Sequence, residues 1–62
     1  MKCGNLVELS AYAQKLKMFR TFCGKVGIVV ETLPRSDHYI VEWFGFPQRR
    51  RSDHRRLDIK RT

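Results

Sequence analysis

The sequence has few cysteines, few acidic residues and no long hydrophobic run, and each scarcity excludes a class of protein. Its two cysteines, Cys3 and Cys23, stand far apart, whereas small disulfide scaffolds depend on several pairs. We therefore expect two free thiols. The most apolar stretch, residues 26–30, is far shorter than the roughly 20 residues of a membrane-spanning helix. No apolar segment follows the first two residues, so we expect a soluble, cytoplasmic protein without a membrane partner.

The chain length allows one small domain. Its 62 residues would bury only roughly 60% of the unfolded surface, and a core of this size rarely supplies more than about 3 to 5 kcal/mol of net stability. A two-domain enzyme with a deep cleft is excluded on this ground. Apolar residues make up 42% of the sequence, which is enough to pack a core and excludes disorder throughout. We expect a single domain over residues 1–62, with no enzymatic activity and no cofactor.

Positive charge is concentrated in two parts of the chain. Thirteen lysines and arginines oppose six acidic residues, which gives a net charge of +7. Eleven of the cations lie within residues 15–25 and 49–62, where only Asp53 and Asp58 oppose them. We call these two segments the basic windows. A field of one sign attracts polyanions, so this segregation favours nucleic acid as a partner.

Short β-branched or alternating segments separated by turn signals predict an all-β fold. We expect strands at residues 6–10, 26–33, 38–44, within the Arg-rich segment 48–56, and at 57–59. Pro34 to Asp37 supplies a hairpin turn, because proline fixes φ and the aspartate side chain can bond nearby backbone. Residues 10–22 form a long basic loop, in which Ser10 as N-cap and apolar residues at helical spacing permit a short helical turn.

Closing such a sheet into a small barrel would remove unpaired edges and give the apolar residues one interior. Leu57 and Ile59 favour an anchored last strand over a disordered tail. The residues expected inside are Val7, Leu9, Val26, Ile28, Val30, Tyr39, Val41, Trp43, Leu57 and Ile59. At about 1.5 to 3 kcal/mol for each large buried side chain, this set can offset the ordering of a short chain.

The chain resembles the KOW motif at residues 22–31, Phe-Cys-Gly-Lys-Val-Gly-Ile-Val-Val-Glu, where two glycines lead into an apolar strand. Gly24 permits a turn with positive φ, and Gly27 lets a neighbouring backbone approach closely. The resemblance implies a five-stranded SH3-like barrel that contacts RNA or a transcription or translation machine. The first loop, residues 11–21, departs from this resemblance because it is longer than KOW domains usually have. Together with the strand at residues 26–31, the Val-Glu-Trp sequence at residues 41–43 and the His-Arg-Arg-Leu-Asp sequence at 54–58 make the whole chain resemble small phage-encoded SH3-like proteins, which implies action in a host cytoplasm.

The cations of both windows are the candidate nucleic-acid contacts. In a barrel, the long first loop and the Arg-rich segment can approach each other and merge into one basic surface. Lysine and arginine then hold phosphates, while Phe44 or Phe46 stacks on unpaired bases at about 1 to 3 kcal/mol per base. The predicted contact residues are Lys15, Lys17, Arg20, Lys25, Phe44, Arg49, Arg50, Arg51, Arg55 and Arg56. The choice between RNA and DNA stays open.

The aromatic residues support an alternative function, a protein-interaction or assembly module. Phe19, Phe22, Ile40, Phe44 and Phe46 exceed what a barrel of this size can hide, and exposed apolar patches usually mark interfaces. This hypothesis predicts a host protein or a second copy as partner. Two opposing interpretations are that Phe19 and Phe22 cover an open end of the barrel, and that the cations only solubilise the surface.

Two further patterns do not predict a reactive site. Cys3, Cys23, His38 and His54 are never two to five residues apart, as ligands of structural zinc are, so we predict no metal site. The sequence Arg-Ser-Asp-His occurs at residues 35–38 and again at 51–54. Adjacent Ser, Asp and His cannot form a catalytic triad, which needs residues from distant parts of a fold. We attribute the repeat to turn chemistry and chance.

Overall fold

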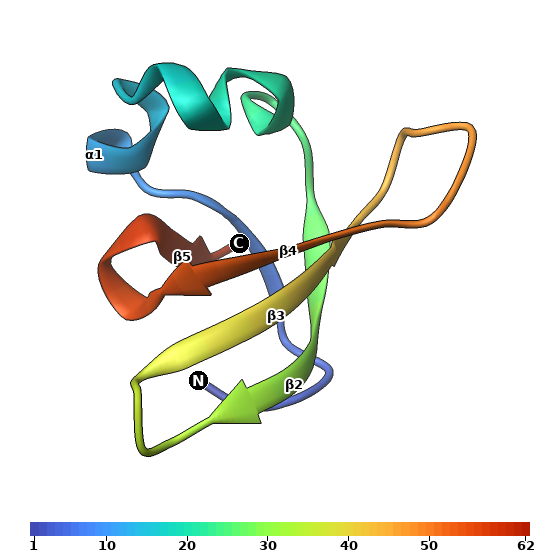
Figure 1. Cartoon of the computed structure of the whole chain (residues 1–62). Coiled ribbons are helices and arrows are strands. Elements are labelled where there is room, and N and C mark those ends of the chain that lie inside the picture. The colour runs from blue at the N-terminus through green and yellow to red at the C-terminus, as the bar shows by residue number, and fades with distance from the viewer.

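The computed structural model describes all 62 residues and contains one five-stranded antiparallel sheet (Figure 1). The strands are β1 (Leu6–Leu9), β2 (Gly27–Leu33), β3 (His38–Trp43), β4 (Arg50–Arg55) and β5 (Ile59–Arg61). Their hydrogen-bonded order is β4-β3-β2-β1-β5, which places β4 and β5 at the two ends. The prediction of a small all-β fold with a strand in the Arg-rich segment is confirmed.

Three short helices connect the strands. The long first loop contains α1 (Ala11–Gln14) and a 3-10 helix, η1 (Lys17–Phe22), and a second 3-10 helix, η2 (Arg56–Asp58), joins β4 to β5. Ser10 caps α1, as predicted, because its hydroxyl accepts a hydrogen bond from the Ala13 amide at 3.2 Å. No helix has the length and apolar character needed to cross a membrane.

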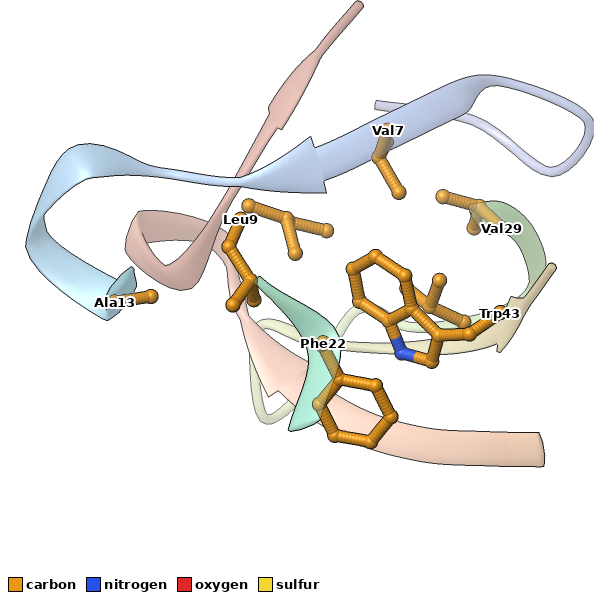
Figure 2. Packing of buried hydrophobic residues seen from close by; sticks show 8 residues of the cluster. Val7, Leu9, Ala13, Phe22, Val29 and Trp43 are labelled. Atoms are coloured by element: carbon orange, nitrogen blue, oxygen red, sulfur yellow. The ribbon is translucent and has the colours of Figure 1, made fainter. Parts of the chain in front are cut away.

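The core lies between the sheet and the segment formed by α1 and η1. Its buried apolar residues are Val7, Leu9, Ala13, Phe22, Val29, Val41, Trp43 and Ile59. Figure 2 shows the indole of Trp43 between Phe22, which comes from η1, and the strand residues Val7 and Leu9. The Trp43 and Phe22 rings are stacked, with centroids 5.0 Å apart. Five of the predicted interior residues are therefore buried, and Tyr39 packs against them half-buried.

The prediction of which residues of β2 face the core is wrong by one residue. Gly27 and Val29 are buried, whereas Val26 is exposed and Ile28 and Val30 are half-buried. Gly27 pairs with Trp43, and a Cβ added to Gly27 would lie 2.5 Å from Cγ1 of Val41. Position 27 faces the core at a point where no side chain fits, so it requires glycine. Its neighbours in the chain, Val26 and Ile28, point to the opposite face.

The predicted last strand is also displaced. Leu57 belongs to η2 and is 54% exposed, so its assignment to the interior is wrong. The neighbouring Asp58 is buried and accepts a hydrogen bond from the Arg55 amide at 3.0 Å. Its carbonyl accepts another from the Ser10 amide at 2.9 Å. These bonds hold a helical turn at Asp58, and β5 begins only at Ile59.

Candidate nucleic-acid interface

The two basic windows meet at the ring of Phe46, in the loop between β3 and β4. Nζ of Lys25 lies 5.4 Å from the ring centroid, and Cζ of Arg50 lies 5.2 Å from it. Both distances are typical of cation–π contacts. The sheet causes this meeting, because Trp43 in β3 pairs with Gly27 on one side and with Arg50 on the other. Lys25 and Arg50 are thereby held at the same end of the sheet.

The local backbone fixes both the ring and the lysine. Gly45 has a φ of +89°, which lets the chain turn sharply after β3. Lys25 passes over this glycine, where an added Cβ would lie 3.2 Å from Nζ. Phe46 is anchored to the core by Phe22, which it meets edge to face with centroids 6.0 Å apart. The aromatic contact therefore ties the basic loop to the packed part of the molecule.

A hollow of about 280 Å³ lies beside this ring. In Figure 1 the loop that carries it projects away from the sheet and is coloured orange. The hollow is lined by Phe46, Pro47, Gln48, Arg49 and Arg50. The lining combines two apolar rings, one amide and two guanidinium groups, which is the mixture of groups that bases and phosphates bind. We call this hollow, together with Lys25, the Phe46 site.

The cations of the Phe46 site have no acidic partner. The three salt bridges join His38 to Asp53, Arg51 to Glu42, and Lys60 to Glu8. Lys25, Arg49 and Arg50 take part in none of them. Their charges therefore remain available to an anion from outside the molecule.

Strand β4 separates the arginines of the second basic window. Residues alternate between the faces of a strand, and Arg51 lies across from Glu42, to which its Nε bonds at 3.1 Å. Arg51 and Arg55 therefore occupy the face opposite Arg50. The expectation that all these arginines lie on one surface is wrong. The sequence does not show which residues of this segment alternate along a strand, so their faces could not be assigned.

The other predicted contacts are exposed but lie apart from Phe46. Lys15 is the C-cap of α1, and Lys17 and Arg20 belong to η1. No ion pair or cation–π contact links these three residues to the second basic window. Arg56 donates a hydrogen bond from its guanidinium to the Ile59 carbonyl at 2.9 Å, so part of it serves the turn at η2.

The two candidate stacking residues occupy different faces. The Phe44 amide bonds to the Val26 carbonyl at 2.9 Å, which continues the β2–β3 ladder by one pair. Trp43 points into the core, so Phe44 points to the outer face, where it is 47% exposed. Phe46, on the Trp43 side, is the aromatic residue that lies beside unpaired cations. The prediction named Phe44 as the stacking residue, whereas the cations of the two windows meet at Phe46.

Two aromatic residues expected at an exposed patch belong to the core. Phe22 is buried, and Phe19 is half-buried with its ring centroid 4.8 Å from that of His54. Both side chains therefore cover the core on the η1 side. Ile40 is half-buried as well, which leaves Phe44 as the exposed member of the predicted set.

A buried polar network was not predicted from the sequence. Trp43 donates a hydrogen bond from Nε1 to Oγ of Ser52 at 2.7 Å, and this hydroxyl lies 2.5 Å from Nε2 of His54. His54 is 1% exposed and its Nδ1 has no hydrogen-bond partner. Burial lowers the pKa of its imidazole below the ordinary value of 6.5, although Asp58 and Asp53 oppose this effect.

The two Arg-Ser-Asp-His copies have different structures. The first occupies the turn after β2 up to Asp37, with His38 beginning β3, and the second is part of β4, so turn chemistry explains only the first copy. They are joined by His38 of the first copy and Asp53 of the second, whose Nδ1 and Oδ1 lie 2.7 Å apart. No carboxylate reaches Nδ1 of His54, so Ser52 and His54 do not form a triad.

The remaining metal-ligating residue types are scattered. Cys3 and Cys23 are free and exposed. No group of three or more histidine, cysteine, aspartate or glutamate side chains is placed to hold a metal ion.

The chain was also compared with known proteins. No protein-family model, no curated protein and no solved structure matches it.

Proposed function

We propose that this protein is a non-enzymatic, KOW-type SH3-like barrel that binds nucleic acid at the Phe46 site. The observation that carries the proposal is the meeting of Lys25 and Arg50 at one aromatic ring, with Arg49 beside them and no carboxylate paired to any of the three. Residues from both basic windows thus contribute to one positive site.

The energetics of this arrangement favour a polyanion. Unpaired cations held close together repel one another, and a phosphate chain relieves the repulsion while releasing its own counterions. Arg51 and Lys60 differ from them because each already has an acidic partner on the neighbouring strand. We therefore assign the phosphate contacts first to Lys25, Arg49 and Arg50, with the exposed Lys15, Lys17 and Arg20 extending the field.

The barrel part of the proposal is supported by the strand arrangement. Strand β1 pairs with both β2 and β5, and η2 turns the chain from β4 directly into β5. Together with the resemblance to KOW domains and to small phage-encoded SH3-like proteins, this leads us to propose a phage protein that acts on RNA, DNA or their machinery in a host cytoplasm.

Fluorescence anisotropy tests the proposal. Labelled RNA and DNA strands are titrated with the protein at about 50 and 200 mM salt, between which electrostatic binding weakens strongly. We expect binding at the lower concentration and a marked loss at the higher one. Absence of binding to every strand at the lower concentration would contradict the proposal.

A second candidate function is self-association through the outer face of the sheet. Leu6 pairs with Ile28, and Val26 bonds to Phe44. Leu6, Val26 and Phe44 are 48%, 37% and 47% exposed, and Ile28 between them is half-buried. These side chains form a continuous apolar strip across β1, β2 and the end of β3, of the kind that marks an interface.

Light scattering distinguishes self-association from a protein that stays monomeric. A dimer or larger assembly that dissociates on the substitution Phe44→Ser would support association through the strip. A protein that stays monomeric at high concentration would exclude self-association by this surface.

A further inference from the structure

We infer that the hollow of the Phe46 site binds one unpaired nucleotide, so that the protein prefers single-stranded to double-stranded nucleic acid. This inference rests on the proposed function and adds to it the form of nucleic acid that is bound. It depends on the size of the hollow, on its lining and on the contacts that hold the Phe46 ring in place.

The size of the hollow limits its occupant. Its volume of about 280 Å³ falls just below the range of roughly 300 to 1,000 Å³ found for pockets that take drug-sized ligands. One planar base with its sugar edge is an appropriate guest, whereas a stacked base pair is too large. The occupant must therefore be a single base that is free of its partner strand.

The lining offers each interaction that an unpaired base needs. The rings of Phe46 and Pro47 present apolar surface for stacking. The amide of Gln48 carries both donors and an acceptor, so it can bond to the edge that a base exposes when it is unpaired. Arg49 and Arg50 at the same hollow supply planar cations for the adjoining phosphates. Apolar, amide and cationic groups therefore converge on one nucleotide.

The flanking cations also hold the site in shape. Lys25 and Arg50 both lie over the Phe46 ring, and Phe22 and Phe46 meet edge to face. The ring is thereby held between the core and the hollow before any ligand arrives. A fixed ring loses little freedom on binding, so its stacking contributes more to affinity than that of a mobile side chain.

A duplex cannot use this site in the same way. Its bases are stacked inside the helix, and extracting one costs a few kcal/mol. The duplex can still bind through its phosphates to the exposed lysines and arginines. We therefore expect both forms to bind, with an additional contribution from the base only in the single strand.

An abasic strand separates the contribution of the base from that of the phosphates. Anisotropy titrations at low salt use three labelled probes of equal length: a single strand with bases, the same strand made abasic, and a duplex. We expect the strand with bases to bind about tenfold tighter than the abasic strand, because base–aromatic stacking is worth about one such factor. Equal affinity for these two strands, or tighter binding of the duplex, would overturn the inference while leaving the proposed function intact.

Two variants locate the effect within the molecule. Phe46→Leu retains an apolar contact for Phe22 but removes the stacking surface, and Gln48→Ala alters an exposed side chain that the fold does not need. We expect both to bring the affinity for the base-containing strand close to the affinity that the same variant has for the abasic strand. Phe44→Leu tests the opposite face, and a loss of the base preference there instead would overturn the inference. Failure of every probe to bind would contradict the proposed function itself.

Discussion

The hydroxyl of Ser52 lies 2.5 Å from Nε2 of His54 and accepts a hydrogen bond from Nε1 of Trp43. Because the Trp43 nitrogen can only donate, the Ser52 hydroxyl accepts from it and forms its second hydrogen bond with Nε2 of His54. The other imidazole nitrogen, Nδ1, is buried without a partner. Phe19 and Phe22 from η1 cover the ring, so a charge on His54 would be poorly solvated.

This geometry predicts that the protein loses stability at mildly acidic pH. The folded-state pKa of His54 is lowered by burial, so below its ordinary value the unfolded chain binds more protons than the folded one. The free energy of unfolding should therefore be constant above about pH 7 and fall on acidification by at most about 1.4 kcal/mol per pH unit. Urea unfolding between about pH 5 and 8 measures this free energy, and its slope against pH should be smaller in His54→Gln. An equal slope in that variant would show that other groups cause the dependence.

Removal of the bridging hydroxyl should destabilise the fold. Ser52→Ala leaves both Nε1 of Trp43 and Nε2 of His54 without their partner, which costs about 1 to 3 kcal/mol. Ser36→Ala is the matched control, because Ser36 is exposed in the β2–β3 turn and its hydroxyl makes only a long 3.4 Å contact to the Leu33 carbonyl. Chemical denaturation should leave this control within about 0.5 kcal/mol of the parent. Equal losses in the two variants would contradict a structural role for the Ser52 network.

The two glycines of the KOW-like segment should respond differently to substitution. Gly27→Ala places a methyl group against Val41 and Trp43, and overpacking of this kind costs about 1 to 3 kcal/mol or more. Gly24 has open space around it but a φ of +76°, so Gly24→Ala costs about 1 to 2 kcal/mol for conformation alone. Asparagine tolerates that conformation, so Gly24→Asn should recover part of the loss. Gly27→Asn should instead be worse than Gly27→Ala, and recovery there would refute the close approach at β3.

The position of the last strand can be tested by two truncations. Ile59→Ala removes a core residue that is 1% exposed and should cost about 2 to 5 kcal/mol. Leu57→Ala removes an exposed residue of η2 and should change the free energy of unfolding by less than about 0.5 kcal/mol. The reverse order, measured by thermal or urea unfolding, would restore Leu57 to the interior and contradict the turn held by Asp58.

The hairpin could be predicted because its signals are local. Pro34 to Asp37 separates two β-branched segments, and β2 and β3 pair around that turn as expected. The face of β2 could not be predicted from local pattern, because apolar residues occupy both faces and give no clear period of two. Gly27 decides the register only through its contact with Trp43, sixteen residues away. Likewise, Leu57 and Ile59 look alike in sequence, and the buried carboxylate of Asp58 separates them.

The candidate site was predictable in composition but not in geometry. The segregation of Lys25 and Arg50 into two windows is visible in the sequence, whereas their meeting depends on the order of β2, β3 and β4. The sequence also cannot show that adjacent arginines point to opposite faces until Arg50 and Arg51 are known to lie in a strand. In the sequence, His54 appeared only as an unlikely metal ligand. Its burial depends on Phe19 and Phe22, which lie far from it in the chain, so no local pattern predicts it.

The salt dependence of single-strand binding tests the central claim most directly. Each cation that contacts a phosphate contributes about 0.7 to the slope of log affinity against log salt for single strands. Lys25→Gln combined with Arg50→Gln should therefore lower the slope by about 1.4. Arg35→Gln, an exposed cation in the turn at the other end of the β2–β3 hairpin, should leave it unchanged. A slope that is unaffected by the double substitution, or equally reduced by Arg35→Gln, would contradict the assignment of the Phe46 site as the place where nucleic acid binds.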